Sequence, residues 1–170
     1  YIGGTEDPRI VYGFGGVIAY KNIDFNFFFQ GTADAHRVIG NSTIFLPGSG
    51  TTVQGNAYSE NLDDRWTDDN QDPYAFWPRL TYGPNKNNYR ASTWWKKDMS
   101  FLRLKTVEIG YTFPKKWMEK IYSKGARVFV SGNNLLCFSP FKLWDPELGT
   151  NNGLKYPMNR SILFGIDINF

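Results

Sequence analysis

The sequence predicts an all-β protein, and three observations support this fold class. Phe, Tyr and Trp number 14, 10 and 6 and together make up 18% of the 170 residues, with 17 glycines beside them. Such a composition suits strands and turns better than a helical bundle. Five segments alternate apolar and polar residues with the period of two that is typical of a half-buried strand. Stretches rich in Gly, Pro and Asn lie between some of these segments, which indicates large loops.

Composition alone leaves two architectures open, a soluble all-β domain and a part of a transmembrane β-barrel. The chain has the length of one ordinary domain, and its mean hydropathy of −0.44 is typical of a soluble protein. A transmembrane barrel, however, alternates apolar lipid-facing and polar lumen-facing residues, so its mean hydropathy does not reveal its apolar face. The lengths of the connections between the strands distinguish these two architectures.

The first predicted hairpin joins a strand over residues 10–20 to a strand over residues 23–32. The second strand carries its apolar side chains on one face, namely Ile23, Phe25, Phe27 and Phe29. Only Lys21 and Asn22 separate the two segments. Alternation on both sides of a two-residue connection predicts an antiparallel hairpin.

Three more strands are predicted over residues 99–113, 126–134 and 159–170. In the first half of segment 99–113, Arg103 and Lys105 interrupt the apolar pattern. We therefore expect a β-bulge there, or a face that is protected from lipid. The last segment alternates most regularly, and its apolar face is formed by Ile162, Phe164, Ile166, Ile168 and Phe170.

The lengths of the connections favour the membrane barrel. A structureless segment as long as residues 33–98 argues against a compact soluble domain, whereas outer-membrane barrels combine short periplasmic turns with long extracellular loops. Residues 33–98 and 135–158 would then be extracellular, and the C-terminus would be periplasmic. The sequence thus predicts a transmembrane antiparallel β-barrel segment in the outer membrane.

The connection after residue 113 begins with Pro114 and has the pattern of a short helical turn, in which Trp117 and Ile121 are four residues apart. Its basic residues are Lys115, Lys116, Lys120 and Lys124. They could reach lipid phosphates at a membrane surface, or they could belong to an ordinary solvent-exposed turn. The sequence leaves both interpretations open. The other basic residues are scattered over a chain of net charge +3, so no nucleic-acid partner is expected.

Several motifs occur in a characteristic order. They are Asp7-Pro8-Arg9, Phe29-Gln30-Gly31, Arg65-Trp66-Thr67, Trp77-Pro78-Arg79-Leu80, Trp94-Trp95, Leu102-Arg103-Leu104-Lys105, Gly110-Tyr111-Thr112-Phe113-Pro114, Gly132-Asn133-Asn134-Leu135 and Trp144-Asp145-Pro146-Glu147. These motifs resemble the C-terminal region of the SusC/RagA family of TonB-linked outer-membrane proteins, which are TonB-dependent transporters. The resemblance extends over nearly the whole chain.

The resemblance implies a larger protein than this chain. Members of the family form a 22-stranded barrel closed by an N-terminal plug, and residues 1–170 would supply its last five strands and two extracellular loops, without the plug. The family imports glycans, oligosaccharides or peptides with a SusD-like surface lipoprotein as partner and with TonB acting through the N-terminal region, which this chain lacks. We therefore expect an importer and no enzyme, and no cofactor.

The resemblance also implies a role for the last strand. Outer-membrane proteins of this kind end in an aromatic residue preceded by alternating apolar residues, and the barrel-assembly machinery reads this pattern. Phe164, Ile166, Ile168 and Phe170 would form the assembly signal, because an unpaired strand edge can be captured by pairing.

Five tryptophans in the predicted loops are candidates for contact with cargo or partner, namely Trp66, Trp77, Trp94, Trp95 and Trp144. Indole rings could stack on sugars, or they could pack the loops and anchor the barrel at the lipid headgroups. A soluble all-β glycan-binding module that uses the same tryptophans is the alternative function, and an outer-membrane enzyme with its site on the loops is a weaker one.

Neither a catalytic nor a metal site is predicted. Asp68, Asn70 and Asp72 alternate as in a calcium loop, but Pro73 occupies the position where an EF-hand needs glycine. His36 is the only histidine, which excludes a site with several histidine ligands. Nothing in the spacing of Asp34, His36 and Ser42 indicates a catalytic triad.

Overall fold

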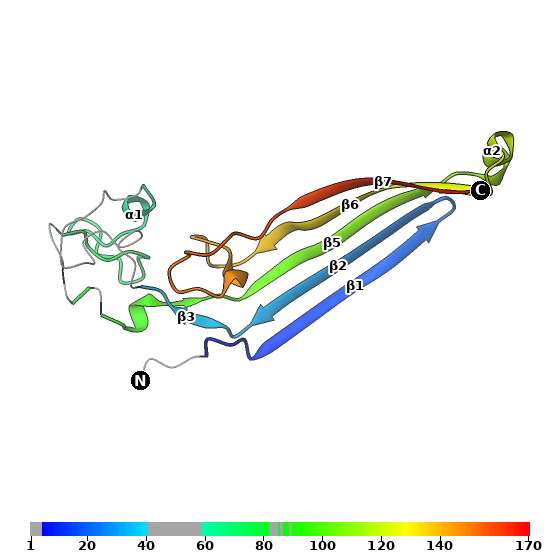
Figure 1. Ribbon diagram of the computed structural model, residues 1–170. Helices are drawn as coiled ribbons and strands as arrows, with labels where there is room; N and C mark the ends of the chain where they lie inside the picture. Colours follow the sequence, from blue (N-terminus) through cyan, green and yellow to red (C-terminus); the bar gives the residue numbers. More distant parts are fainter. Residues whose placement is uncertain (1–4, 41–58, 82–84, 86, 89) are drawn as a thin grey trace. The chain divides into compact units, whose positions relative to one another are not determined.

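The structure is a computed structural model that describes residues 5–40, 59–81, 85, 87–88 and 90–170 (Figure 1). The chain divides into two compact units. We call residues 4–36, 98–148 and 155–170 the sheet unit, and residues 1–3, 37–97 and 149–154 the loop unit.

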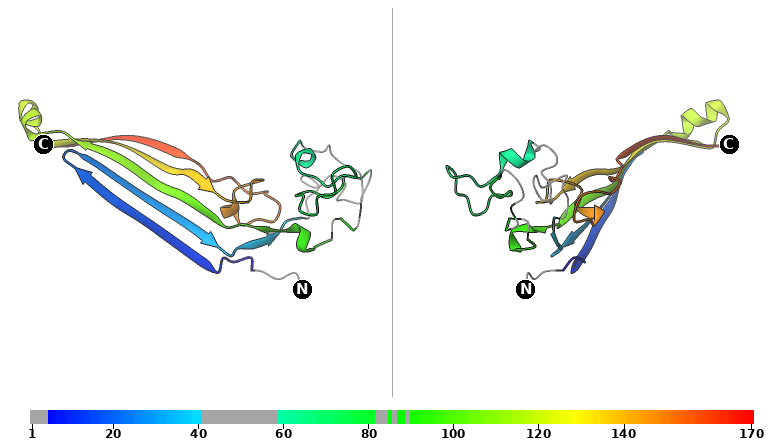
Figure 2. Two further views of the ribbon diagram at one scale, coloured as in Figure 1. Left: turned by 180° about the vertical axis from the view of Figure 1, so that it is seen from behind. Right: turned by 60° about the vertical axis from the view of Figure 1, so that its left-hand side comes forward.

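The sheet unit is built on five antiparallel strands in the order β1-β2-β5-β6-β7. They are β1 (Ile10–Tyr20), β2 (Ile23–Ala33), β5 (Phe101–Thr112), β6 (Gly125–Phe138) and β7 (Ser161–Asn169). The strands lie side by side in a single layer, which the right-hand view of Figure 2 shows nearly edge-on. The predicted all-β fold class is confirmed.

The two faces of this sheet differ in chemistry. Register places Phe14, Phe29, Leu104 and Leu136 in one cross-strand row, and Ile18, Phe25, Ile109, Val130 and Phe164 in another. Many of these side chains are exposed, and Phe164 reaches 80%. No second sheet or helical layer covers them among the described residues. An apolar surface that spans five strands requires an apolar environment.

The opposite face is mostly polar. It carries Asp24, Asn26 and Gln30 on β2, Arg103 and Glu108 on β5, Arg127 and Ser131 on β6, and Asp167 on β7. Four of these residues form ion pairs across the strands, as described below. The sheet therefore has one apolar and one polar face, which is typical of a transmembrane barrel that separates lipid from water.

The β-bulge expected in the first half of the third strand is confirmed. The register between β2 and β5 shifts between Phe28 and Phe29, and the register between β5 and β6 shifts around Lys105. There, Asn134 has a φ of 54°, and β6 has two residues opposite one on β5. Because this irregularity interrupts the alternation, the sequence predicted a strand that ends at residue 134, whereas β6 continues to Phe138.

The helices are short. They are α1 (Glu60–Asp63), α2 (Lys115–Met118) and the 3₁₀ turns η1 (Thr93–Trp95), η2 (Glu119–Ile121) and η3 (Pro146–Leu148). Among the residues that the structure describes, no helix is long and apolar enough to cross a membrane. Two short strands, β3 (His36–Val38) and β4 (Lys96–Asp98), pair with each other, so the region predicted as a long loop contains local secondary structure.

The loop unit has a buried core, although it contains little regular structure. Its buried apolar side chains are Ile39, Ala75, Trp77 and Trp95. Backbone hydrogen bonds hold the segments together, among them Trp66 N–H to Trp77 O at 2.9 Å and Ile39 N–H to Trp95 O at 2.9 Å. The loop unit is therefore packed around aromatic side chains.

Candidate functional site

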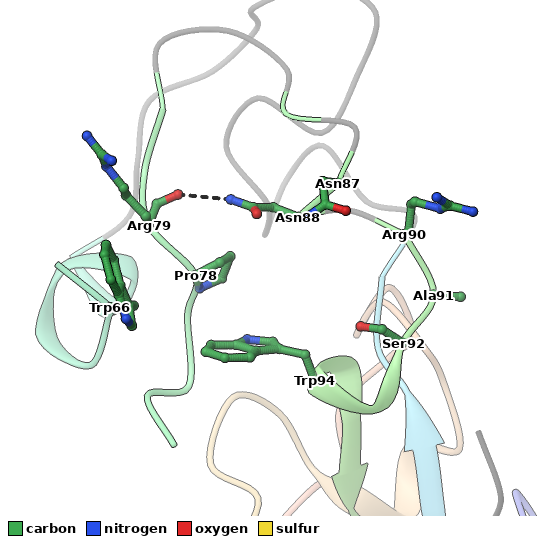
Figure 3. Close-up of a pocket in the computed structure, with 9 residues that line it drawn as sticks. All are labelled: Trp66, Pro78, Arg79, Asn87, Asn88, Arg90, Ala91, Ser92 and Trp94. Atoms are coloured by element: carbon green, nitrogen blue, oxygen red, sulfur yellow. Dashed lines mark hydrogen bonds between the residues drawn. The ribbon is translucent and has the colours of Figure 1, made fainter. Parts of the chain in front are cut away.

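A cavity of about 570 Å³ lies within the loop unit and is the best candidate for a ligand site. Its lining comes from three short segments and consists of Trp66, Pro78, Arg79, Asn87, Asn88, Arg90, Ala91, Ser92 and Trp94. Figure 3 shows the two indole rings near Pro78, with the Asn88 side chain turned toward the Arg79 backbone. Asn88 Nδ2 donates to the Arg79 carbonyl at 3.3 Å.

Backbone pairing and side-chain hydrogen bonds position the two indoles. Trp66 follows Arg65, which forms an isolated parallel bridge with Trp77. Trp94 lies in η1, and its Nε1–H donates to the Phe76 carbonyl at 3.3 Å. Both indoles are half-buried, so part of each ring remains available for contact.

The arrangement suits a ligand with both apolar and polar surface. An indole face offers a broad apolar contact, while amides and guanidinium groups supply hydrogen bonds with directional preference. Arg79 also forms an exposed ion pair with Asp68, with Nη2 and Oδ2 3.2 Å apart. A sugar ring or a peptide backbone with its side chains has this combination of surfaces.

Trp77 and Trp95 have a different position, in the core of the loop unit. They are 4% and 2% exposed, and their ring centroids lie 6.1 Å apart in an edge-to-face arrangement. Trp95 Nε1–H donates to the Asn88 carbonyl at 2.7 Å, which fixes one wall of the cavity. These two residues thus belong to the core that supports the cavity, and they do not line it.

Lys97 contacts the same core through Phe76, whose ring packs against Trp77. Its Nζ lies 3.9 Å from the centroid of the Phe76 ring and 3.5 Å from the Phe76 carbonyl oxygen. Burial lowers the pKa of Lys97 below its usual value, although the charge of Asp64 opposes this shift. The ammonium group is therefore held by an aromatic face and a carbonyl in partly desolvated surroundings.

Trp144 lies in the sheet unit and does not line the cavity. Its ring packs against buried Phe141, with centroids 4.7 Å apart and planes at 75°. It belongs to the segment after β6 that contains η3. Of the five tryptophans that the sequence singles out, the structure therefore brings Trp66 and Trp94 together at one cavity.

A buried ion-pair cluster fixes this η3 segment to β5, and we call it the β5 latch. The Arg103 side chain is 3% exposed, and its Nη2 lies 2.5 Å from Asp145 Oδ1 while its Nε lies 2.9 Å from Glu147 Oε2. Lys105 Nζ donates to Glu147 Oε1 at 2.6 Å. The latch thus joins two motifs that lie 42 residues apart.

A second cluster lies on the polar face of the sheet. Arg127 Nη2 contacts Asp24 Oδ2 at 2.5 Å and Glu108 Oε1 at 2.7 Å, and its Nη1 is 4.0 Å from Asp167 Oδ2. Gly110 makes room for it, because a Cβ at this position would collide with the Arg127 guanidinium. The cluster ties together strands β2, β5, β6 and β7.

The sequence singled out neither cluster as a site. Arg103 and Lys105, two positions apart in a predicted strand, were a usable signal for the basic half of the latch, since side chains two apart in a strand share a face. Asp145 and Glu147 lie at the 3₁₀ turn η3, where this rule does not apply, so the sequence did not indicate the acidic half. Nothing local in the sequence connects Asp24 with Arg127, which are 103 residues apart.

The residues of the predicted assembly signal lie along β7 and at its end. Phe164, Ile166 and Ile168 are 80%, 68% and 50% exposed, and Phe170 is 77% exposed. Val130 faces Phe164, and Val128 faces Ile166 on the neighbouring strand. The stripe is thus part of the apolar face.

In the part of the chain that the structure describes, no three His, Cys, Asp or Glu side chains are placed to hold a metal ion. The acidic loop has other partners: Asp68 pairs with Arg79, and Asp72 Oδ1 accepts the Tyr74 N–H at 2.8 Å. His36 Nδ1 lies 3.6 Å from Asp34 Oδ1. Ser42, the third residue of the hypothetical triad, lies outside the described residues.

Comparison with known proteins identifies relatives over nearly the whole chain, although no family model matches. The chain is 33% identical to the TonB-dependent receptor P26 of Formosa agariphila over 98% of its own length and 17% of that protein. It is 23% identical to the TonB-dependent receptor SusC of Bacteroides thetaiotaomicron over 89% of its length and 14% of that protein. The chain therefore spans about one sixth of the length of P26.

Solved structures give the same result. The chain matches the structure of the RagAB peptide transporter with a TM-score of 0.76 and 28% identity, covering 98% of this chain and 18% of that one. It matches the RagAB peptide importer in the "open-open" state with a TM-score of 0.75 and the same identity and coverage.

Proposed function

The chain is homologous over nearly its whole length to TonB-dependent receptors, and from this homology we propose that it forms the last five strands of a 22-stranded importer barrel. The observation that carries the proposal is the uncovered apolar face of the five-stranded sheet. In a bilayer this face contacts lipid, while the opposite face with the Arg127 cluster lines the lumen. The relatives are outer-membrane transporters and receptors rather than enzymes.

We infer the orientation in the membrane from the lengths of the connections. The β1–β2 and β5–β6 connections are short and share one end of the sheet, near Phe170 (Figure 1). The β2–β5 and β6–β7 connections are long. Because outer-membrane barrels have short turns in the periplasm, we place residues 33–98 and 135–158 outside the cell and the end of β7 in the periplasm.

The intact importer works with two partners in this proposal. A SusD-like surface lipoprotein covers the extracellular side, and TonB acts through a region outside this chain. The support is the homology to SusC and to the RagAB structures. The apolar stripe of Phe164, Ile166, Ile168 and Phe170 serves the barrel-assembly machinery as a recognition strand.

The cargo is an oligosaccharide or a peptide, and the Trp66–Trp94 cavity contacts it. Two partly exposed indoles beside Asn and Arg side chains support this assignment. The solved RagAB relatives are a peptide transporter and importer, so the test includes peptides as well as oligosaccharides.

Fractionation of cells that express the intact protein tests the proposed location. The protein should remain in the outer-membrane fraction and require detergent for extraction. Release into the soluble fraction would overturn the barrel proposal and favour the alternative, a soluble glycan-binding module.

A pair of variants tests the cavity. Uptake of labelled oligosaccharide and peptide mixtures is measured in cells that carry Trp66→Ala/Trp94→Ala in the intact importer. Uptake should fall by about tenfold, because two aromatic contacts of about 0.7 kcal/mol each together amount to about 1.4 kcal/mol, a factor of ten. Tyr74→Ala is the matched control, because Tyr74 is 91% exposed and does not line the cavity. Equal uptake by the double variant and the control would reject a role of the cavity in import.

A further inference from the structure

The connection between β5 and β6 has a charge that the proposed import function does not use. Within residues 114–124 it carries Lys115, Lys116 and Lys120, together with Lys124, against the single acid Glu119. All five side chains are exposed. Lys115, Lys116 and Lys120 have no acidic partner among the described residues. The segment therefore presents a concentrated positive charge at this end of the sheet.

An aromatic row leads from the apolar face of the sheet into the same connection. Tyr111 belongs to the apolar face, since it pairs with Ile23 and Val128. The ring of Phe113 packs edge-on against Tyr111 with centroids 5.3 Å apart, and Trp117 follows at 6.4 Å from Phe113. Trp117 is 55% exposed. The lipid-facing surface thus continues beyond the strand and ends at an exposed indole beside the lysines.

The connection is fixed to the sheet. Met118 is buried, and Pro114 O accepts the Trp117 N–H at 2.9 Å. Ser123 Oγ donates to Asn169 O at 2.6 Å, and Lys124 Nζ donates to Phe170 O at 2.8 Å. These bonds hold the turn against the end of β7, which preorganises the lysines around Trp117.

We propose that this connection, which we call the Trp117 turn, binds the headgroups of anionic phospholipids in the periplasmic leaflet of the membrane. Indole rings settle at the level of the headgroups, and lysines beside a membrane are attracted to anionic lipids. A surface that combines both has the pattern of an interfacial lipid contact. The inference rests on the proposed function, since it requires the sheet to span the membrane with this end in the periplasm.

A phospholipid explains the site better than free phosphate does. A soluble anion would engage the lysines alone, whereas the row from Tyr111 to Trp117 continues the surface that contacts acyl chains. The β1–β2 turn provides an internal comparison at the same end of the sheet: it has Tyr20 on its apolar side and only Lys21, whose Nζ lies 5.1 Å from the Tyr20 ring centroid. We assign anionic lipid selectivity to the Trp117 turn and not to the β1–β2 turn.

Native mass spectrometry of the intact, delipidated importer tests the assignment, with phosphatidylglycerol as the probe and phosphatidylethanolamine as the zwitterionic reference. The test variant is Lys115→Gln/Lys116→Gln/Lys120→Gln, which leaves the hydrogen-bonded Lys124 in place. The control is Lys142→Gln/Lys155→Gln/Arg160→Gln, which removes three positive charges from the β6–β7 connection at the other end of the strands.

The test variant should lose about tenfold in affinity for phosphatidylglycerol, and added salt should weaken the wild-type interaction in the same way. Its affinity for phosphatidylethanolamine should not change, and the control should keep wild-type selectivity. Trp117→Ala should weaken the binding of both lipids. Inorganic phosphate that displaces phosphatidylglycerol completely, or equal selectivity in test variant and wild type, would overturn the proposal. Failure of the barrel proposal is recognised separately, because the protein would then not be found in the outer-membrane fraction.

Discussion

The sheet unit and the loop unit bury their apolar side chains in opposite ways. In the loop unit, Trp77 and Trp95 are almost fully buried, although their surroundings contain little regular structure. In the sheet unit, a regular five-stranded sheet leaves Phe14, Ile18 and Phe164 more than half exposed. The region with the more regular backbone therefore has the less protected apolar surface.

The difference shows which solvent each unit is built for. A chain segment in water must cover its aromatic rings, because apolar surface exposed to water costs free energy. A strand in a bilayer satisfies its backbone by pairing with its neighbours and leaves its apolar side chains in contact with lipid. The two aromatic populations of this chain, on the strands and in the loops, follow these two requirements.

The largest effect is expected for the core of the loop unit. Trp95→Ala should destabilise this unit by about 3–5 kcal/mol, because it removes a large buried side chain and leaves a cavity. Pulse proteolysis of the intact protein in detergent should show faster cleavage between residues 59 and 97, while membrane insertion remains normal. Tyr74→Ala, at an exposed position of the same unit, should change stability by less than about 0.5 kcal/mol. Similar proteolysis rates for both variants would contradict a packed loop core.

A comparable effect is expected at the β5 latch. Arg103→Met removes the cation that pairs with Asp145 and should cost about 3 kcal/mol, since breaking a buried ion pair leaves uncompensated charge, whereas Glu147 keeps Lys105 as its partner. Hydrogen exchange of residues 139–148 should become faster, with the strands unchanged. Adding Asp145→Asn should restore part of the protection, because it neutralises the carboxylate that Arg103 paired, while Glu147 keeps Lys105 as its partner. If the double variant exchanges as fast as Arg103→Met, uncompensated charge is not the cause.

A smaller effect tests the two faces of the sheet directly. Phe164→Arg places a cation on the apolar face and should destabilise the inserted barrel by about 2–4 kcal/mol near the bilayer centre. Leu163→Arg changes the neighbouring residue of β7, which is also exposed but belongs to the opposite face, and it should be tolerated. The amount of heat-modifiable, folded barrel in outer-membrane preparations measures both. Equal loss for the two variants would mean that the faces do not differ in environment.

Most of the strand architecture could be predicted because it depends on local alternation. The hairpin of β1 and β2 has the two-residue connection that the sequence indicates, and the regular alternation from Ile162 to Ile168 coincides with β7. The end of β6 was predicted four residues too early, because two residues opposite one at Asn134 interrupt the alternation. A period-2 pattern cannot continue through a bulge.

The candidate site was less predictable than the fold. All five tryptophans lie in connections between predicted strands, yet Trp66 and Trp94 line a cavity, Trp77 and Trp95 form a core, and Trp144 packs on Phe141. Neighbours as close as Trp94 and Trp95 have different environments, since the Trp94 Nε1–H donates to the Phe76 carbonyl and the Trp95 Nε1–H donates to the Asn88 carbonyl. Local sequence does not report which side of a loop is covered.

The sequence by itself determined the class of the fold and the resemblance to TonB-dependent receptors, because alternation and ordered motifs are properties of the chain that need no partner. Only the tertiary structure decided which side chains meet. The pairing of Arg103 with Asp145, the Asp24–Arg127 contact and the Trp66–Trp94 cavity all depend on strands and loops distant in sequence. Such contacts arise from register and loop closure, and no local propensity encodes them.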